Sequence, residues 1–273
     1  MTAPAPAPAP ALAAVLEPLR SVARRSNRIA GHAGRFAFLM RDLFIGIAEW
    51  RIWLPRTMDQ ATNIGYGSLA IVLLVAGFAG AVTALQTGYQ FTSSVIPTYY
   101  AGGVVTAGVV LELGPVLTGL ILAGRIGARY AAELGTMRVT EQIDALESLG
   151  RSPMSHLLLP RIIAGILVIP ALTVFANVMG IASGYVAASG SLNLSFTEFT
   201  YGSRYFFHTF DLYYSIIKAF FFAGAVTVIP CYIGYNTQQG AEGVGRSTTT
   251  SVVAASITIL LLDTVLAKVL LGT

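Results

Sequence analysis

Residues 161–188 read RIIAGILVIPALTVFANVMGIASGYVAA, and after Arg161 this run carries no charged side chain. A helix needs about 20 mainly apolar residues to cross the hydrocarbon core of a bilayer, so the stretch is long enough to span a membrane. Similar stretches occur at residues 64–86, 103–124, 213–235 and 250–271. The sequence therefore predicts five membrane-spanning helices.

The composition supports this prediction. Apolar residues make up 55% of the 273-residue chain and charged residues only 11%, whereas a soluble domain carries about 25% charged residues. The mean hydropathy is +0.69, which excludes an intrinsically disordered chain. The single cysteine, Cys231, lies in an apolar run and is interpreted as a small buried residue. The predicted fold class is an all-α integral membrane protein.

The N-terminal region differs from the rest of the chain. Residues 1–11 form an alanine- and proline-rich tail that is expected to be disordered. Residues 12–56 combine arginines with apolar residues at helical spacing and include both tryptophans, Trp50 and Trp53, which indicates interfacial amphipathic helices. A soluble helix packed on the domain is the alternative. The five-span domain is then 57–273, and the interleaved apolar residues argue against nucleic-acid binding.

Basic residues indicate the orientation of the chain. The connection between the second and third spans contains Arg125, Arg129, Arg138, Arg151 and Arg161. The connection at 87–102 contains no Lys or Arg. Because cytoplasmic loops are enriched in Lys and Arg, the N-terminus and the segment 125–160 are expected in the cytoplasm and the C-terminus outside.

The segment 125–160 contains a predicted short helix. Thr140 is a plausible cap and Gly150 a plausible stop. Acidic residues fall on one arc of this helix: Glu141, Asp144 and Glu147. Apolar residues fall on the opposite arc: Val139, Ile143, Leu146 and Leu149. The pattern fits either a solvated loop helix or a docking helix for a cytoplasmic subunit, and the residues alone leave both open.

Two carboxylates, Glu112 and Asp263, stand inside predicted spans. A charge at mid-bilayer is costly and usually faces a cavity or a partner. Glu112 precedes Gly114-Pro115 and can mark a broken helix that lines a cavity. The alternatives are an ion pair with Arg125 or Lys218, or a protonated acid. Asp263 is expected to be a structural intramembrane charge.

A binding site for an apolar ligand in such a bundle should be mainly apolar with few polar groups at its mouth. The outer ends of the first two spans offer candidates for this mouth: Leu85, Gln86, Tyr89, Tyr99 and Tyr100. An aromatic belt at the membrane interface is the alternative interpretation of the tyrosines.

Motifs for catalysis and metal binding are lacking in the sequence. The only lysines, Lys218 and Lys268, follow Ile217 and Ala267, so no GxxxxGK[ST] motif for ATP occurs. No HExxH motif occurs either, and the three histidines are scattered. We expect no catalytic residues, no metal and no bound cofactor. If transport is driven by ATP, another chain must bind the nucleotide.

Two runs carry a family resemblance. Residues 112–120 read ELGPVLTGL and continue as LAGRIGA at 122–128, and residues 132–147 read AELGTMRVTEQIDALE. Both resemble the signature of the MlaE/YrbE family of permease subunits of lipid ABC transporters. The resemblance covers most of residues 40–273.

The resemblance implies a homodimer with five spans per protomer and a helix between spans two and three that couples to a separate ABC ATPase. The coupling residues implied are Glu133, Arg138, Glu141, Asp144 and Glu147. It also implies a lipid substrate, most often a phospholipid, an MCE-domain partner on the outer face and a bacterial inner-membrane location. A proton-coupled secondary transporter that uses Glu112 or Asp263 is the alternative function.

Overall fold

The computed structural model describes residues 31, 34–91, 97–238 and 240–272. The predicted tail 1–11 and the predicted helix 12–30 lie outside these residues. The chain divides into two compact units, Met1–Ala48 and Glu49–Thr273. The described residues fold into helices and short connections, which confirms the predicted all-α class.

In the first unit, residues 34–46 are helical. Leu39 and Leu43 are buried, whereas Phe38 and Phe44 are exposed. In the second unit, the first long helix is α2 (Trp50–Gln90). It begins before the predicted start of the five-span domain. Residues 50–56, which the sequence assigned to the interfacial region, are therefore the first turns of this long helix.

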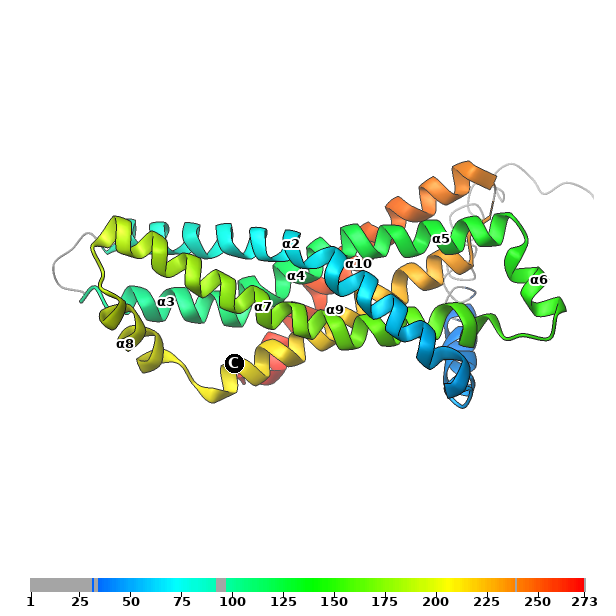
Figure 1. The fold of residues 1–273 in the computed structure, drawn as a ribbon, viewed down its shortest axis with the longest axis horizontal. Helices are drawn as coiled ribbons and strands as arrows, with labels where there is room; N and C mark the ends of the chain where they lie inside the picture. The colour runs from blue at the N-terminus through cyan, green and yellow to red at the C-terminus, as the bar shows by residue number, and fades with distance from the viewer. Residues whose placement is uncertain (1–30, 32–33, 92–96, 239, 273) are drawn as a thin grey trace, which may run out of the picture. The chain divides into compact units, whose positions relative to one another are not determined.

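Five helices of the described chain are long and apolar enough to cross a membrane, as predicted. They are α2 (Trp50–Gln90), Tyr100–Val139, Met154–Leu192, α9 (Thr209–Tyr235) and α10 (Gly240–Leu271). The second comprises α3 (Tyr100–Gly108), the π-helical turn η1 (Val109–Leu113), α4 (Gly114–Leu122), the π-helical turn η2 (Ala123–Gly127) and α5 (Ala128–Val139). The third comprises the π-helical turn η3 (Met154–Leu158) and α7 (Leu159–Leu192). Two shorter helices, α6 (Gln142–Ser148) and α8 (Phe196–Phe206), lie at opposite ends of this bundle (Figure 1).

Close packing between α2 and α7 depends on glycine. A Cβ atom on Gly80 would collide with the backbone carbonyl of Gly180. A Cβ on Gly180 would lie 2.8 Å from Val109, and one on Gly184 would also crowd its neighbours. Gly180 and Gly184, which have GxxxG spacing in the third span, therefore allow the helix backbones to approach closely.

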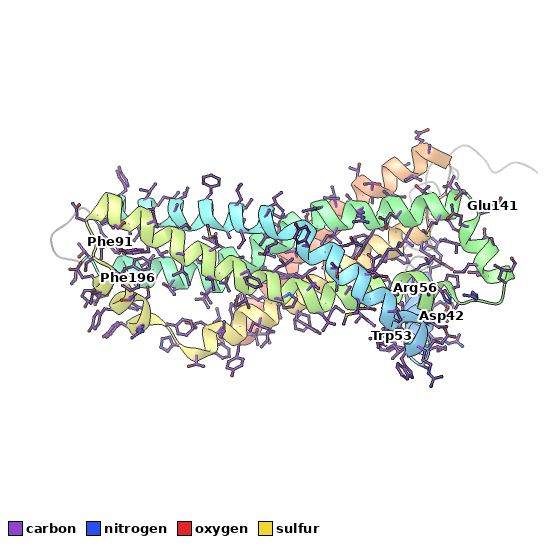
Figure 2. All side chains as sticks on the ribbon, in the orientation of Figure 1. Asp42, Trp53, Arg56, Phe91, Glu141 and Phe196 are labelled. Atoms are coloured by element: carbon purple, nitrogen blue, oxygen red, sulfur yellow. The ribbon has the colours of Figure 1, made fainter. Side chains whose placement is uncertain are left out.

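Helix α9 lies in the middle of the bundle and packs against α5, α7 and α10. Its inward face is made of small and aromatic residues such as Ala219, Phe222 and Ala223, all fully buried. Glu141 and Arg56 mark one end of the bundle and Phe91 and Phe196 the other (Figure 2). The bundle thus has two distinct ends, and α9 packs among the other helices between them.

Candidate functional site

A buried lysine joins three helices inside the bundle. Lys218 of α9 has a fully buried side chain, and its Nζ lies 2.7 Å from Oε2 of Glu112 in η1. The same Nζ forms an ion pair with Asp263 of α10. It also donates a hydrogen bond of 3.1 Å to the backbone carbonyl of Leu111. We call Glu112, Lys218 and Asp263 the central charge cluster.

The local sequence explains the third contact, to the carbonyl of Leu111. Proline has no backbone N–H and its ring disturbs the helix at the residue four positions earlier. For Pro115 that residue is Leu111, whose carbonyl accepts the Lys218 hydrogen bond. The chain forms the π-helical turn η1 directly before Gly114-Pro115. The helix is therefore widened at this point and remains continuous, where the sequence suggested a break.

The central charge cluster is closed on one side and open on the other. The Asp263 side chain is 16% exposed, whereas the Glu112 side chain is 51% exposed. The sequence left open whether Glu112 lines a cavity or pairs with Arg125 or Lys218. The structure pairs it with Lys218, while Arg125 donates to the carbonyl of Gly67 in α2. An exposed carboxylate edge remains available to a molecule outside this chain.

A second polar pair lies on neighbouring turns. Asn177 of α7 donates a hydrogen bond of 2.9 Å to the hydroxyl of Ser215, one turn before Lys218 on α9. A Cβ atom on Gly114 would collide with Oδ1 of Asn177, so the glycine lets α4 approach this pair. Polar side chains of α7 and α9 therefore meet beside Gly114, in the part of the bundle that holds the cluster.

At the α8 end, two of the predicted mouth residues join an aromatic group. The rings of Tyr99 and Tyr100 lie 4.8 Å apart, and Tyr99 meets Tyr201 of α8 at 5.3 Å. Tyr100 meets Phe206 of α8 at 5.0 Å. Gly202 permits this contact, because a Cβ there would collide with the carbonyl of Tyr99.

The other three predicted mouth residues, Leu85, Gln86 and Tyr89, lie on the last turns of α2 with exposed side chains. The aromatic residues of α8 escaped the sequence analysis. Their signal was the Tyr- and Phe-rich stretch 196–206.

Helix α8 begins with a capping box. The hydroxyl of Ser195 accepts a hydrogen bond of 3.2 Å from the backbone N–H of Glu198. In return, the Glu198 carboxylate accepts bonds from the backbone N–H and the hydroxyl of Ser195, at 3.0 and 2.8 Å. These bonds hold the pKa of Glu198 below its usual range, because they stabilise the ionised carboxylate. The box fixes the start of the helix that carries the aromatic residues.

The short helix α6 is built differently from the sequence prediction. Thr140 is the C-cap residue of α5, and α6 is preceded by Glu141 in the left-handed conformation with φ of 60°. Gly150, with φ of 70°, ends α6 as predicted. The N–H of Gly150 bonds to the carbonyl of Glu147 and that of Arg151 to the carbonyl of Leu146. This is the Schellman arrangement, which only glycine adopts easily at that position.

Two acidic residues of this segment, Asp144 and Glu147, have partners within the chain. Asp144 pairs with Arg138 at 2.5 Å, and Glu147 accepts a hydrogen bond of 3.1 Å from the hydroxyl of Tyr235 in α9. The guanidinium of Arg138 also lies over the Tyr235 ring. These contacts hold α6 to the ends of α5 and α9.

The apolar residues of α6 do not all face inward. Ile143 is fully buried, whereas Leu149 is 75% exposed. The predicted apolar arc is therefore divided between the fold and the surface.

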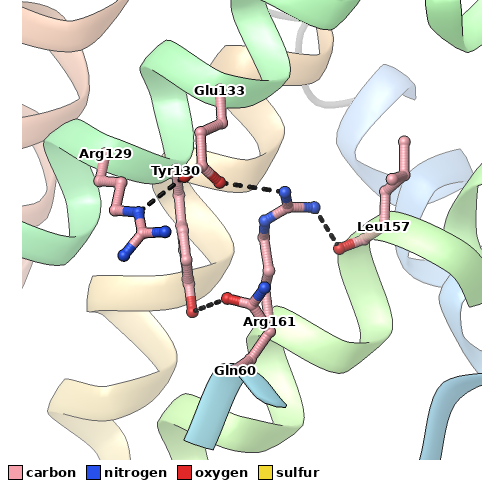
Figure 3. Close-up of polar contacts among 6 residues, drawn as sticks. All are labelled: Gln60, Arg129, Tyr130, Glu133, Leu157 and Arg161. Atoms are coloured by element: carbon pink, nitrogen blue, oxygen red, sulfur yellow. Dashed lines mark hydrogen bonds and ion pairs between the residues drawn. The ribbon is translucent and has the colours of Figure 1, made fainter. Parts of the chain in front are cut away.

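Glu133, the remaining predicted coupling residue, connects α5 to α7. It accepts hydrogen bonds from Arg129 at 2.6 Å and from Arg161 at 3.1 Å (Figure 3). Arg161 also donates to the carbonyl of Leu157 at 2.7 Å. Tyr130 reaches Gln60 of α2 at 3.5 Å. We call Arg129, Glu133 and Arg161 the α5–α7 charge network. The sequence analysis counted Arg161 only as a loop arginine, because its partner lies 28 residues away.

Taken together, five membrane-length helices, a charge cluster centred on a buried lysine and a short helix held at one end define a multi-span helical permease. The permease MlaE family model matches residues 57–269. The chain is 34% identical over 242 residues to the "Intermembrane phospholipid transport system permease protein MlaE" of Haemophilus influenzae, covering 88% of this chain and 92% of that protein.

Two further relatives carry the name "Probable ABC transporter permease protein". The one from Rickettsia felis is 36% identical over 90% of this chain and 95% of its own length. The one from Synechocystis is 38% identical over 81% of this chain and 84% of its own length. This chain belongs to the MlaE permease family of multi-pass membrane proteins.

Proposed function

We propose that this chain is the membrane-spanning subunit of an ATP-driven transporter for lipids, with phospholipids as the substrate class. The subunit binds no nucleotide or metal of its own, and a separate ABC ATPase hydrolyses ATP. A second copy of the chain completes the lipid cavity. The relative from Haemophilus influenzae is named for intermembrane phospholipid transport, which supports the substrate class.

The central charge cluster supports a role in handling a lipid with a polar head. Its ammonium is buried, yet the Glu112 side chain keeps 51% of its surface exposed. Polar groups at the edge of an otherwise apolar bundle can orient a headgroup while acyl chains remain in apolar surroundings. Glu112 therefore faces the proposed cavity, and Asp263 holds Lys218 in place.

A homodimer is supported by the outer surface of α10. Val253, Ile257 and Leu261 are all more than half exposed and recur at helical spacing. The same helix carries Asp263, so a second copy packed along α10 would enclose the space next to the cluster. The aromatic group at the α8 end would then lie at the outer mouth, where an MCE-domain protein takes over the lipid.

The observation that carries the ATPase-coupling proposal is the geometry of α6. It is a short helix fastened to α5, and therefore to the second span, by the pair Arg138–Asp144. It nevertheless presents Leu149, with 75% of its surface exposed, away from the fold. An exposed apolar residue on a fixed protrusion is typical of a contact with another protein. We place α6 on the cytoplasmic side, because Arg138 and Arg151 flank it.

Leu149→Ser tests this proposal. It should weaken capture of the ABC ATPase and reduce ATP-dependent lipid transport about tenfold, since a lost buried apolar contact of about 1.4 kcal/mol gives that factor. Its fold should be unaffected because the side chain makes little contact within the chain. Ser148→Ala is the matched control. Full transport by the folded Leu149→Ser protein would contradict the proposed docking residue.

A proton-coupled carrier remains the second function to be tested. Against it, both intramembrane carboxylates share one ammonium partner, and the relatives are named as ABC transporter permeases. Reconstituted lipid transport should require ATP and the ATPase, and should persist when a protonophore removes the proton gradient. Transport that stops with the protonophore and continues without ATP would favour the carrier.

A further inference from the structure

A basic pocket lies at the α6 end of the bundle, away from the central charge cluster. It has a volume of 530 Å³ and is lined by the first turns of α2 and by the connection that leads into η3. Its charged and polar lining residues include Arg51, Arg56, Arg151 and His156. Glu49 is the one acidic residue of this lining. Three arginines against one glutamate make the pocket a site for an anion.

The pocket extends toward a buried guanidinium. A neighbouring pocket of 210 Å³ shares Arg56 and His156 with the first and is also lined by Asp59 and Arg161. The side chain of Arg161 is only 7% exposed. Its Nε is buried and has no hydrogen-bond partner in the part of the chain that the structure describes. A buried donor without an acceptor is costly, so this group points to a ligand that is not part of the chain.

The chemistry of the lining selects phosphate. Guanidinium groups are planar forks that bind phosphate oxygens in pairs. His156 is 8% exposed, and its Nδ1 lies 3.1 Å from the carbonyl of Ser152. That contact orients the imidazole ring with its proton on Nδ1. The guanidinium groups therefore recognise the phosphate, and Nε2 of the neutral ring can accept a hydrogen bond from a headgroup hydroxyl.

The surroundings indicate that the phosphate belongs to a lipid. Ile52 and Pro55 line the same pocket. On the adjoining turns of α2, Leu54 is 43% exposed and Met58 is 67% exposed. These turns lead directly into the first membrane span. Acyl chains can therefore lie along α2 while the headgroup enters the pocket, an arrangement that a soluble phosphate compound would not need.

We propose that the pocket formed by Arg51, Arg56, Arg151 and His156, with Arg161 at its inner end, binds the phosphate headgroup of an anionic phospholipid from the cytoplasmic leaflet. This site is separate from the transport cavity and does not depend on the proposed ATP-driven function. Its occupant lies next to the pair Arg161–Glu133 and so stabilises the α6 end of the bundle.

The test uses the purified full chain in detergent micelles and counts bound lipid by native mass spectrometry. Phosphatidylglycerol and phosphatidic acid should be retained about tenfold more tightly than phosphatidylcholine, a factor that corresponds to about 1.4 kcal/mol. The double variant Arg56→Gln/Arg151→Gln should lose this preference. The matched control, Arg204→Gln/Arg246→Gln, removes the same charge from exposed sites outside the pocket and should keep it.

Arg151→Gln alone serves if the double variant does not fold, because Arg151 lies on an exposed connection. Unchanged preference in the folded variants would overturn the proposal. A competition with inorganic phosphate separates the two possible sources of the anion. Anionic lipid that stays bound in excess phosphate supports the lipid site. Complete displacement of the anionic lipid by inorganic phosphate would assign the pocket to a free anion and overturn the lipid assignment.

Discussion

Lys218 and Arg161 are both buried cations that join distant helices, but they are satisfied to different degrees. The ammonium of Lys218 has three donors, and it meets three oxygens, from Leu111, Glu112 and Asp263. The guanidinium of Arg161 has five N–H donors, and its Nε–H lacks an acceptor among the described residues. A cation with complete partners serves the fold. Arg161, with one donor left over beside a basic pocket, is the cation for which we propose a further partner.

The largest effect is expected at Lys218. Lys218→Met leaves Asp263 and Glu112 without their shared cation, and removing one partner of a buried ion pair costs about 3–5 kcal/mol. The free energy of unfolding should fall by that amount in SDS titrations followed by circular dichroism. Lys268→Met, at an exposed lysine near the end of α10, should have little effect. An unchanged Lys218→Met midpoint would refute the structural role of the cluster.

Asp263→Asn, added to Lys218→Met, should recover part of the loss. It removes a charge that would otherwise be buried alone. A double variant that is less stable than Lys218→Met would show that Asp263 has another partner.

A smaller effect is expected at Arg161. Arg161→Met leaves Glu133 with Arg129 at 2.6 Å, so the carboxylate keeps one partner. The loss should be about 1–3 kcal/mol, the range for hydrogen bonds to charged groups. Arg129→Met removes the more exposed of the two arginine partners of Glu133 and should lower the free energy of unfolding by at most about 1 kcal/mol. The same SDS titration measures both, and a loss at Arg161 equal to that at Lys218 would abolish the distinction between the two cations.

The spans could be predicted from the sequence because length and apolarity alone decide them. The contacts of the charge cluster could not. Arg125 and Lys218 were equally possible partners of Glu112, and only the packing of α9 against η1 selects Lys218. The π-helical turns also escape prediction, since they add one residue per turn without changing composition.

The short helix α6 shows a different limit of prediction from sequence. The arc argument treated 139–149 as one helix, but Val139 ends α5 and α6 stops at Ser148. Leu149 therefore lies beyond the last helical residue, and its side chain is exposed where the pattern placed it on the apolar arc. The periodicity identified the helix, while the short length of α6 decided which residues face the solvent.

A double-mutant cycle can sharpen the role of Lys218. Pro115→Ala restores an N–H that can bond to the carbonyl of Leu111, which Lys218 otherwise satisfies. In the Pro115→Ala background, Lys218→Met should therefore cost about 1 kcal/mol less, the worth of one hydrogen bond. The same unfolding assay provides the coupling energy. A coupling energy near zero would show that the hydrogen bond from Lys218 to the carbonyl of Leu111 adds little to its ion pairs with the two carboxylates.

The smallest effect concerns the exposed capping box of α8, where the charge is neither buried nor shared with a distant helix. The folded-state pKa of Glu198 is lowered by its bonds from Ser195. Its contribution is therefore complete above the usual pKa of a glutamate and is lost as the pH falls through the lower folded-state value. Hydrogen exchange at the first amides of α8, corrected for intrinsic rates, should quicken over that acidic window.

Glu198→Gln should remove the pH dependence of that protection while its side-chain oxygen still accepts from Ser195. Ser195→Ala should quicken exchange at every pH, because it removes the hydroxyl that accepts from the N–H of Glu198. Neither change should alter exchange near Lys218 or Arg161, since the box lies at the opposite end of the bundle from α6. Acid-sensitive exchange that persists in Glu198→Gln would place the titrating group elsewhere. Capping therefore acts locally, whereas the two buried cations hold helices together.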